Sequence, residues 1–227
     1  METIAERLKS VQITVEQSTL GAHRPLNAVK LLAVSKTKPV SDIVQAYEAG
    51  QLLFGENYVQ EGVEKIQMLK SYDNIEWHFI GPLQSNKTRL VAENFDWVQA
   101  IDRLKIAQRL NDQVTPKKIL NVCIQVNIDD DQNKAGISAN ELDDFAKAIS
   151  ELPNLRLRGL MTIPKANQSQ AEQTTSFANM AMLFEELKKQ YLSVDTLSMG
   201  MSGDMQNAIN NGSNMVRVGS AIFGSRK

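Results

Sequence analysis

The 227-residue sequence contains a single cysteine, Cys123, and only two histidines, His23 and His78. One cysteine excludes a disulfide within the chain, and its apolar surroundings, ILNVCIQVN, predict a core residue. Two separated histidines, without a CxxC or HExxH pattern, argue against a multi-histidine metal site. We therefore expect neither a disulfide-stabilised fold nor metal chemistry.

Charge of one sign and long apolar runs are also scarce. The formal net charge is −1, which provides no attractive field for nucleic acid or for an anionic membrane. No apolar run approaches the roughly 20 residues that a bilayer-spanning helix needs. The N-terminal segment METIAERLKSVQITVEQS is amphipathic and carries acidic residues, unlike a secretory signal. From these absences we expect a cytoplasmic protein that binds neither nucleic acid nor membrane.

What the sequence does contain is an alternation of short apolar runs with helix-period segments. Eight runs predict strands, at residues 31–36, 52–57, 77–81, 97–101, 120–127, 157–163, 196–200 and 215–224. Eight such units favour an α/β fold, a single closed (β/α)8 TIM-type barrel. An open doubly wound sheet is the alternative, but no GxGxxG pattern follows any strand. We expect one domain over residues 1–227.

Helix signals fill the gaps between these runs. A capping box, Ser138 with Glu141, predicts the start of a helix that ends before Pro153. The segment TTSFANMAMLFEELKKQY predicts the longest helix. Residues 1–29 hold an additional N-terminal helix and its lead-in, which we expect to cap the barrel. The last apolar run leaves almost no chain for a following helix.

In a TIM-type barrel, functional groups gather where the carboxyl ends of the strands meet. The predicted strand ends deliver one lysine, one arginine, several amides and several glycine or serine turns, and lack the paired carboxylates of a glycosidase. They include Lys36, Glu56, Asn57, the segment GPLQSNK (81–87), Asn127, Thr162, Arg217, Gly219 and Ser220.

The segment SMGMSGDMQNAINNG predicts an anion site at this end of the barrel. Ser202 is a good N-cap, Gly203 permits close approach of a ligand, and Gly212 ends the helix. Free N–H groups at a helix N-terminus can hold a phosphate, and barrels often bind phosphate after strands seven and eight. The alternative is an ordinary capped helix, whose dipole Asp204 complements.

Lys36 ends the first apolar run, in KLLAVSKTKP. Burial and nearby cations lower a lysine pKa, and the neutral amine is the form that attacks a carbonyl to make a Schiff base. An aldehyde that carries a phosphate, such as pyridoxal 5′-phosphate (PLP), would suit both ends of the expected site. The alternative is a strand-end lysine that reaches solvent, and Lys38 fits that description better.

Six ordered motifs look like those of the pyridoxal phosphate homeostasis protein family: LLAVSKTKP, FGENYVQE, WHFIGPLQSNK, GLMTIP, SMGMSGD and VRVGSAIFG. The resemblance runs from about residue 30 to the C-terminus. Members of this family resemble the N-terminal barrel domain of bacterial alanine racemase and hold PLP as an internal aldimine. The resemblance implies that Lys36 is the Schiff-base lysine and that Ser202, Gly219 and Ser220 bind the phosphate.

The resemblance also implies that Arg217 faces the pyridine nitrogen and that Asn57 contacts the cofactor ring or its hydroxyl. A salt bridge near the barrel rim is the alternative for Arg217, and a turn-stabilising side chain is the alternative for Asn57. Lys134 matches a family lysine on a mobile loop, with a solvated loop charge as the default. For His78 we prefer a hydrogen-bonded structural role over one at the barrel mouth.

A resemblance to a racemase does not make the chain a racemase. In alanine racemase the second acid–base group is a tyrosine from a separate β domain of the partner subunit. We expect no such domain here, because the sequence ends three residues after the last strand motif. The four tyrosines, at positions 47, 58, 72 and 191, fall in helices or helix-flanking segments.

The leading hypothesis is therefore a non-catalytic, monomeric PLP-binding protein of intracellular PLP (vitamin B6) homeostasis. It would buffer the cofactor or deliver it to PLP-dependent apoenzymes. A weak PLP-dependent amino-acid racemase and a Schiff-base aldolase that uses Lys36 without PLP are the alternatives.

Overall fold

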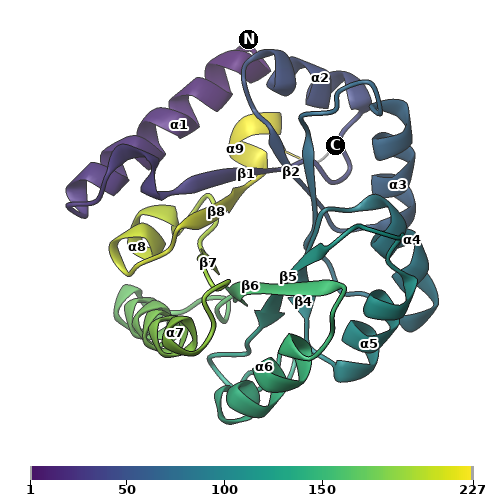
Figure 1. Ribbon diagram of the computed structural model, residues 1–227. Helices are drawn as coiled ribbons and strands as arrows, with labels where there is room; N and C mark the ends of the chain where they lie inside the picture. Colours follow the sequence, from purple (N-terminus) through teal and green to yellow (C-terminus); the bar gives the residue numbers. More distant parts are fainter. Residues whose placement is uncertain (1, 226–227) are drawn as a thin grey trace.

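The computed structural model describes residues 2–225 and shows a closed barrel of parallel strands ringed by helices (Figure 1). Each strand pairs with the next in the chain, and the last pairs with the first, with Lys30 opposite Met215. The strands are β1 Lys30–Val34, β2 Leu53–Glu56, β3 Glu76–Phe79, β4 Trp97–Ile101, β5 Leu120–Gln125, β6 Leu155–Met161, β7 Thr196–Ser198 and β8 Met215–Val218. This confirms the expected TIM-type barrel. Residues 1 and 226–227, at the ends of the expected domain, lie outside the described part.

The helices follow the strands in the expected alternation. They are α1 Ile4–Gly21, α2 Val40–Glu48, α3 Val59–Met68, α4 Thr88–Asn94, α5 Leu104–Gln113, α6 Leu142–Ser150, α7 Gln170–Gln190, α8 Met205–Asn210 and α9 Ser220–Phe223, with short 3-10 turns at Leu26–Ala28, Ser85–Lys87 and Ala139–Glu141. The Ser138–Glu141 capping box is present, and it precedes the 3-10 turn that leads into α6. The predicted long helix is α7, which begins earlier than expected at a second capping box, Ser169 with Glu172. Within residues 2–225, none of the helices combines the length and hydropathy that a membrane crossing requires.

The N-terminal helix α1 lies in the outer ring, between α2 and α8, rather than across an end of the barrel as expected (Figure 1). It buries Ile4, Leu8, Val11 and Val15, a spacing of three and four residues that places them on one helix face. This position has a physical reason, because α9 is a single turn and covers little of the wall beside β8 and β1. Helix α1 supplies the missing cover.

Two predicted boundaries are wrong. The run 215–224 contains β8 and then α9, because the apolar residues Ile222 and Phe223 are buried in a helical turn as well as they would be in a strand. The residue at the N-cap position of the helix after β7 is Asp204 rather than Ser202. The Asp204 side chain does not cap a helix N–H; its Oδ1 accepts a hydrogen bond of 2.5 Å from the Met201 N–H in the preceding turn. Ser202 therefore lies in the turn that precedes α8.

The barrel interior is partly apolar and partly polar. Leu32, Ile80 and Met215 form one interior apolar cluster. Cys123 lies in another, with Trp97, Ala100 and Met161, which confirms it as a core residue. Four polar side chains, from β3, β4, β7 and β8, are buried as well: His78, Gln99, Ser198 and Arg217. These four side chains lie below the carboxyl ends of the strands.

Candidate functional site

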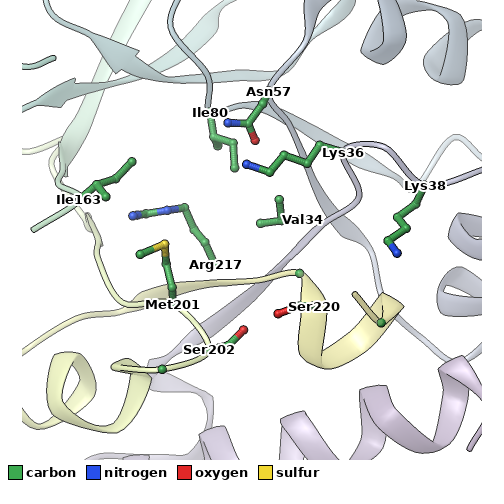
Figure 2. A pocket seen from close by; sticks show the side chains of 13 residues that line it. Val34, Lys36, Lys38, Asn57, Ile80, Ile163, Met201, Ser202, Arg217 and Ser220 are labelled. Atoms are coloured by element: carbon green, nitrogen blue, oxygen red, sulfur yellow. The ribbon is translucent and has the colours of Figure 1, made fainter. Parts of the chain in front are cut away.

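A cavity of about 320 Å³ opens at the carboxyl ends of the strands (Figure 2). Its walls come from β1 and the turn after it, from the turns after β2, β3, β6 and β7, and from β8 with α9. The lining residues are Val34, Lys36, Lys38, Asn57, Ile80, Ile163, Met201, Ser202, Gly203, Arg217, Gly219, Ser220 and Gly224. All six residues expected to bind a cofactor are among them, although they lie on four separate segments of the chain.

The two lysines after β1 take different directions. Lys36 extends into the cavity, toward Asn57 and Arg217, whereas Lys38 points away from them (Figure 2). Between them Thr37 has a φ of 61°, in the left-handed region that non-glycine residues rarely adopt. The Lys38 Nζ donates a 2.9 Å hydrogen bond to the carbonyl of Ser225. The amine presented to the cavity is therefore that of Lys36.

The turn that carries Lys36 is held in place by α3. Glu61 Oε1 accepts a 2.6 Å hydrogen bond from the Thr37 N–H, and the Lys65 Nζ donates one of 2.7 Å to the Ser35 carbonyl. The residues on both sides of Lys36 are thus tied to one helix. The strained conformation at Thr37 persists because these contacts constrain it.

Lys65 also forms ion pairs with two carboxylates beneath the turn. Its Nζ lies 2.8 Å from Glu56 Oε1 and 2.6 Å from Glu61 Oε1, and both Lys65 and Glu56 are buried. Burial raises the pKa of Glu56, and the Lys65 ammonium acts in the opposite direction. We did not predict this cluster from the sequence. The sequence feature that could have indicated this cluster is the i, i+4 spacing of Glu61 and Lys65 on a helix.

The wall opposite Lys36 carries two serine hydroxyls. The side chains of Ser202 and Ser220 both line the cavity there, one from the turn after β7 and one at the start of α9 (Figure 2). Gly219 lies against β1, since an added Cβ would come within 3.1 Å of the Val34 carbonyl oxygen. An added Cβ at Gly203 would meet nothing within 4 Å, so the backbone there is open to a ligand. This wall can donate to an anion.

Arg217 lies between these two walls. It is 4% exposed, and it donates from Nη1 to Ser198 Oγ at 2.7 Å and from Nη2 to the Thr162 carbonyl at 2.8 Å. Burial lowers the pKa of Arg217 to about 10, so the guanidinium stays charged at neutral pH. Within residues 2–225 its nitrogens form no ion pair, and the alternative of a rim salt bridge is therefore wrong.

Asn57 presents an unused acceptor. Its Oδ1 atom is buried and has no hydrogen-bond partner among the described residues. A buried polar atom without a partner costs free energy, so such an atom beside a cavity is a candidate ligand contact. The backbone of Asn57 is packed against Gly81, where an added Cβ would come within 2.2 Å of the Asn57 carbonyl oxygen.

Three other candidates occupy different places. Lys134 donates from Nζ to the carbonyls of Ile163, at 3.0 Å, and Pro164, so it ties two loops together at the edge of the cavity. His78 lies inside the barrel, hydrogen-bonded to Glu76 and to a neighbouring strand, which confirms the structural interpretation. Asn127 is engaged with the backbone of its own loop, through the carbonyl and N–H of Asp131.

The donor set suits an organic anion rather than a metal. Within residues 2–225, no group of three or more His, Cys, Asp and Glu side chains is placed to hold a metal ion. The cavity instead offers an amine, a guanidinium, a free amide oxygen and two hydroxyls. These groups fit a phosphate-bearing aldehyde with a polar ring, since each end of such a molecule meets a group that binds it.

Comparison with known proteins agrees with this chemistry. The family model for the alanine racemase N-terminal domain matches residues 17–227. The pyridoxal phosphate homeostasis protein of Pasteurella multocida (strain Pm70) is 58% identical over 228 residues, which cover 99% of this chain and 98% of that protein.

Solved structures extend the comparison. PipY of Synechococcus elongatus PCC7942 with PLP bound matches with a TM-score of 0.84 and 36% identity, over 98% of this chain and 100% of that chain. Alanine racemase from Corynebacterium glutamicum shares the fold, with a TM-score of 0.70 and 16% identity over 97% of this chain and 61% of that chain. The chain belongs to the pyridoxal phosphate homeostasis protein family, which has the barrel fold of the alanine racemase N-terminal domain.

Proposed function

We propose that this chain acts in PLP homeostasis by binding PLP in the cavity after the strands, with Lys36 as the point of covalent attachment. When bound, PLP supplies an aldehyde that condenses with a neutral primary amine and releases one water. The observation that carries the proposal is the direction of Lys36. Its amine extends into the cavity from the wall opposite the hydroxyls of Ser202 and Ser220 (Figure 2).

The remaining lining groups fit the rest of the cofactor. Ser202, Gly219 and Ser220 would hold the phosphate, and the open backbone at Gly203 leaves room for it. The unpartnered Oδ1 of Asn57 would accept from the ring hydroxyl. Arg217, anchored on two sides, would face the ring nitrogen.

Arg217 bears on the choice between carrier and enzyme. A guanidinium with a pKa of about 10 donates hydrogen bonds at neutral pH and does not readily give up a proton. It therefore keeps the ring nitrogen unprotonated, which weakens the cofactor as an electron sink. None of the four tyrosines lines the cavity, so no second acid–base group of that kind faces Lys36. We accordingly propose that the chain buffers PLP or delivers it to apoenzymes without catalysing a reaction of its own.

Borohydride reduction followed by peptide mapping tests the attachment point. We expect the label on Lys36, and we expect Lys36→Ala to lose the visible absorbance of lysine-bound PLP while keeping some phosphate-held cofactor. Lys38→Ala is the matched control, because Lys38 lines the same cavity and points elsewhere (Figure 2). A label confined to Lys38 or Lys134 would refute the assignment.

A second experiment tests the absence of catalysis. The PLP-loaded protein is incubated with single amino acids in deuterated water, and exchange of the α-proton is followed by NMR. We expect no exchange beyond that given by free PLP. Exchange at an enzyme-like rate would show that the chain is a racemase-type enzyme instead.

A further inference from the structure

A chain of hydrogen bonds crosses the barrel interior below the cavity. The Arg217 Nη1 donates to Ser198 Oγ at 2.7 Å, and Ser198 Oγ donates to Gln99 Oε1 at 2.6 Å. Gln99 Nε2 then lies 2.9 Å from His78 Nδ1, and His78 Nε2 lies 2.9 Å from Glu76 Oε1. The chain runs from β8 at the cavity to the first residue of β3, at the opposite end of the barrel.

The donors and acceptors of this chain follow one another in a single direction. A guanidinium can only donate, so Ser198 accepts from Arg217 and has its single proton free for Gln99. The oxygen of the Gln99 amide faces Ser198 and accepts this proton, and the amide nitrogen faces His78. The second amide proton points to Met215 Sδ, 3.2 Å away, so a reversed amide would lose that contact as well.

The same logic fixes the tautomer of His78. Because Gln99 donates to Nδ1, that nitrogen carries no proton, and Nε2 holds the proton and donates it to the Glu76 carboxylate. The surroundings agree with a neutral ring: His78 is fully buried and stacks on Trp97 with ring centroids 5.0 Å apart. Burial lowers the pKa of His78, although the carboxylates of Glu76 and Asp96 act in the opposite direction.

We propose that Gln99 and His78 are positioning residues, which act through Ser198 to fix the plane of the Arg217 guanidinium at the cofactor cavity. A guanidinium is rigid and planar, so two anchors, Ser198 Oγ and the Thr162 carbonyl, set the direction of its remaining donors. If Gln99 stops accepting, Ser198 has no partner that holds its hydroxyl in the acceptor orientation. This inference rests on the proposed function, in which Arg217 faces the ring nitrogen.

The first test does not need the cofactor. Nitrogen-15 NMR of the histidine side chains in the ligand-free protein reports the tautomer directly, and His78→Asn identifies the signals. We expect a neutral imidazole with the proton on Nε2. A proton on Nδ1, or a charged ring at pH 7, would overturn the proposed direction whatever the protein does with PLP.

The second test changes the central link. In Gln99→Met a side chain of similar shape cannot accept from Ser198. We expect PLP affinity to fall about tenfold, which corresponds to the loss of one hydrogen bond. Gln99→Glu keeps an acceptor toward Ser198, so it should retain most of the affinity, while His78 takes up a second proton. Gln125→Met is the matched control, because Gln125 is another buried barrel glutamine, bonded to the Ala135 carbonyl away from the chain.

Ser198→Ala serves as the second variant, since it removes the link to Arg217 with the smallest change in volume. We expect it to weaken PLP binding about tenfold as well and to shift the absorbance of the bound cofactor. Equal affinities for Gln99→Met, Ser198→Ala and Gln125→Met would overturn the inference. Such a result, with the borohydride label still on Lys36, would leave the proposed function intact. Loss of that label in the parent protein would refute the proposed function and leave the tautomer result standing.

Discussion

Replacing Lys65 with methionine is the sharpest test of how the Lys36 turn is built. Lys65 is 5% exposed and donates to Ser35, Glu56 and Glu61. Methionine keeps the length and the apolar stem of the side chain and removes the charge. Among residues 2–225, Glu56, which is 0% exposed, would then keep only the hydroxyl of Ser35 as a donor. We expect Lys65→Met to lower the free energy of unfolding strongly.

The size of the loss follows from what the Glu56 carboxyl can do without its partner. A buried charge that loses its partner typically costs about 3–5 kcal/mol. Taking up a proton instead costs ~3.7 kcal/mol at pH 7, because an unfolded glutamate has a pKa of about 4.3 and each pH unit is worth ~1.4 kcal/mol. Burial already raises the pKa of Glu56 in the parent protein, so part of this cost is present there. We therefore expect a loss of about 3 kcal/mol.

The expected loss of stability in Lys65→Met also changes with pH in a defined direction. In Lys65→Met the folded-state pKa of Glu56 lies further above its unfolded value than in the parent. A carboxyl of this kind contributes most below the unfolded pKa, and its contribution falls as pH rises toward the folded pKa. At pH 5 protonation costs only ~1 kcal/mol. The difference in stability between parent and variant should therefore shrink by about 2 kcal/mol between pH 7 and pH 5.

Urea unfolding followed by circular dichroism at pH 5 and pH 7 measures both quantities. Lys9→Met is the matched control, because Lys9 is exposed on helix α1, and it should change stability by less than about 0.5 kcal/mol. Lys65→Met combined with Glu56→Gln should regain part of the loss, since the fully buried carboxyl is then absent and only the partly exposed Glu61 lacks its partner. A loss below about 1 kcal/mol at pH 7, or one that does not change with pH, would refute the reasoning.

Three further predictions follow from single sites. Burial raises the pKa of the Cys123 thiol to about 12. Cys123 should therefore resist iodoacetamide in the folded protein and react after unfolding, as mass spectrometry would show. Rapid alkylation of the folded protein would contradict its burial. Gly159→Ala should cost about 3 kcal/mol or more in urea unfolding, because φ is 148° and an added Cβ would come within 1.8 Å of a β7 carbonyl oxygen. Gly21→Ala, with nothing within 4 Å of the added Cβ, is its control, and equal stability of the two variants would count against this explanation. Ser202→Ala and Ser220→Ala should each weaken binding of PLP about tenfold in calorimetry and leave pyridoxal, which has no phosphate, unaffected; equal losses for both ligands would argue against a phosphate site.

Much of the fold could be predicted from local patterns. Short, mainly apolar runs with turn signals between them identified every strand of the barrel, because a strand covered on both faces is apolar along most of its length. The same reasoning failed where a strand and a helix would bury the same residues equally well. Ile222 and Phe223 are apolar and buried, and nothing in that run alone distinguishes strand β8 from helix α9. Ser202 was misassigned as an N-cap because Asp204, two residues later, is a residue type that the N-cap position favours equally, and the helix begins there.

The chemistry of the site divides in a similar way. Lys36, Asn57 and Arg217 could be chosen from the linear order of motifs, since the ends of parallel strands must meet at one face of a barrel. The contacts that hold them could not be chosen in this way. Ser198 and Gln99 are 99 positions apart, and Lys65 and Ser35 are 30 apart, so their hydrogen bonds form only in the tertiary structure. Residue type and spacing specify which groups a chain can bring to a site. Closure of the sheet decides which of these groups touch, because contacts across a barrel depend on the register of the strands and on which side chains point inward, not on neighbours in sequence.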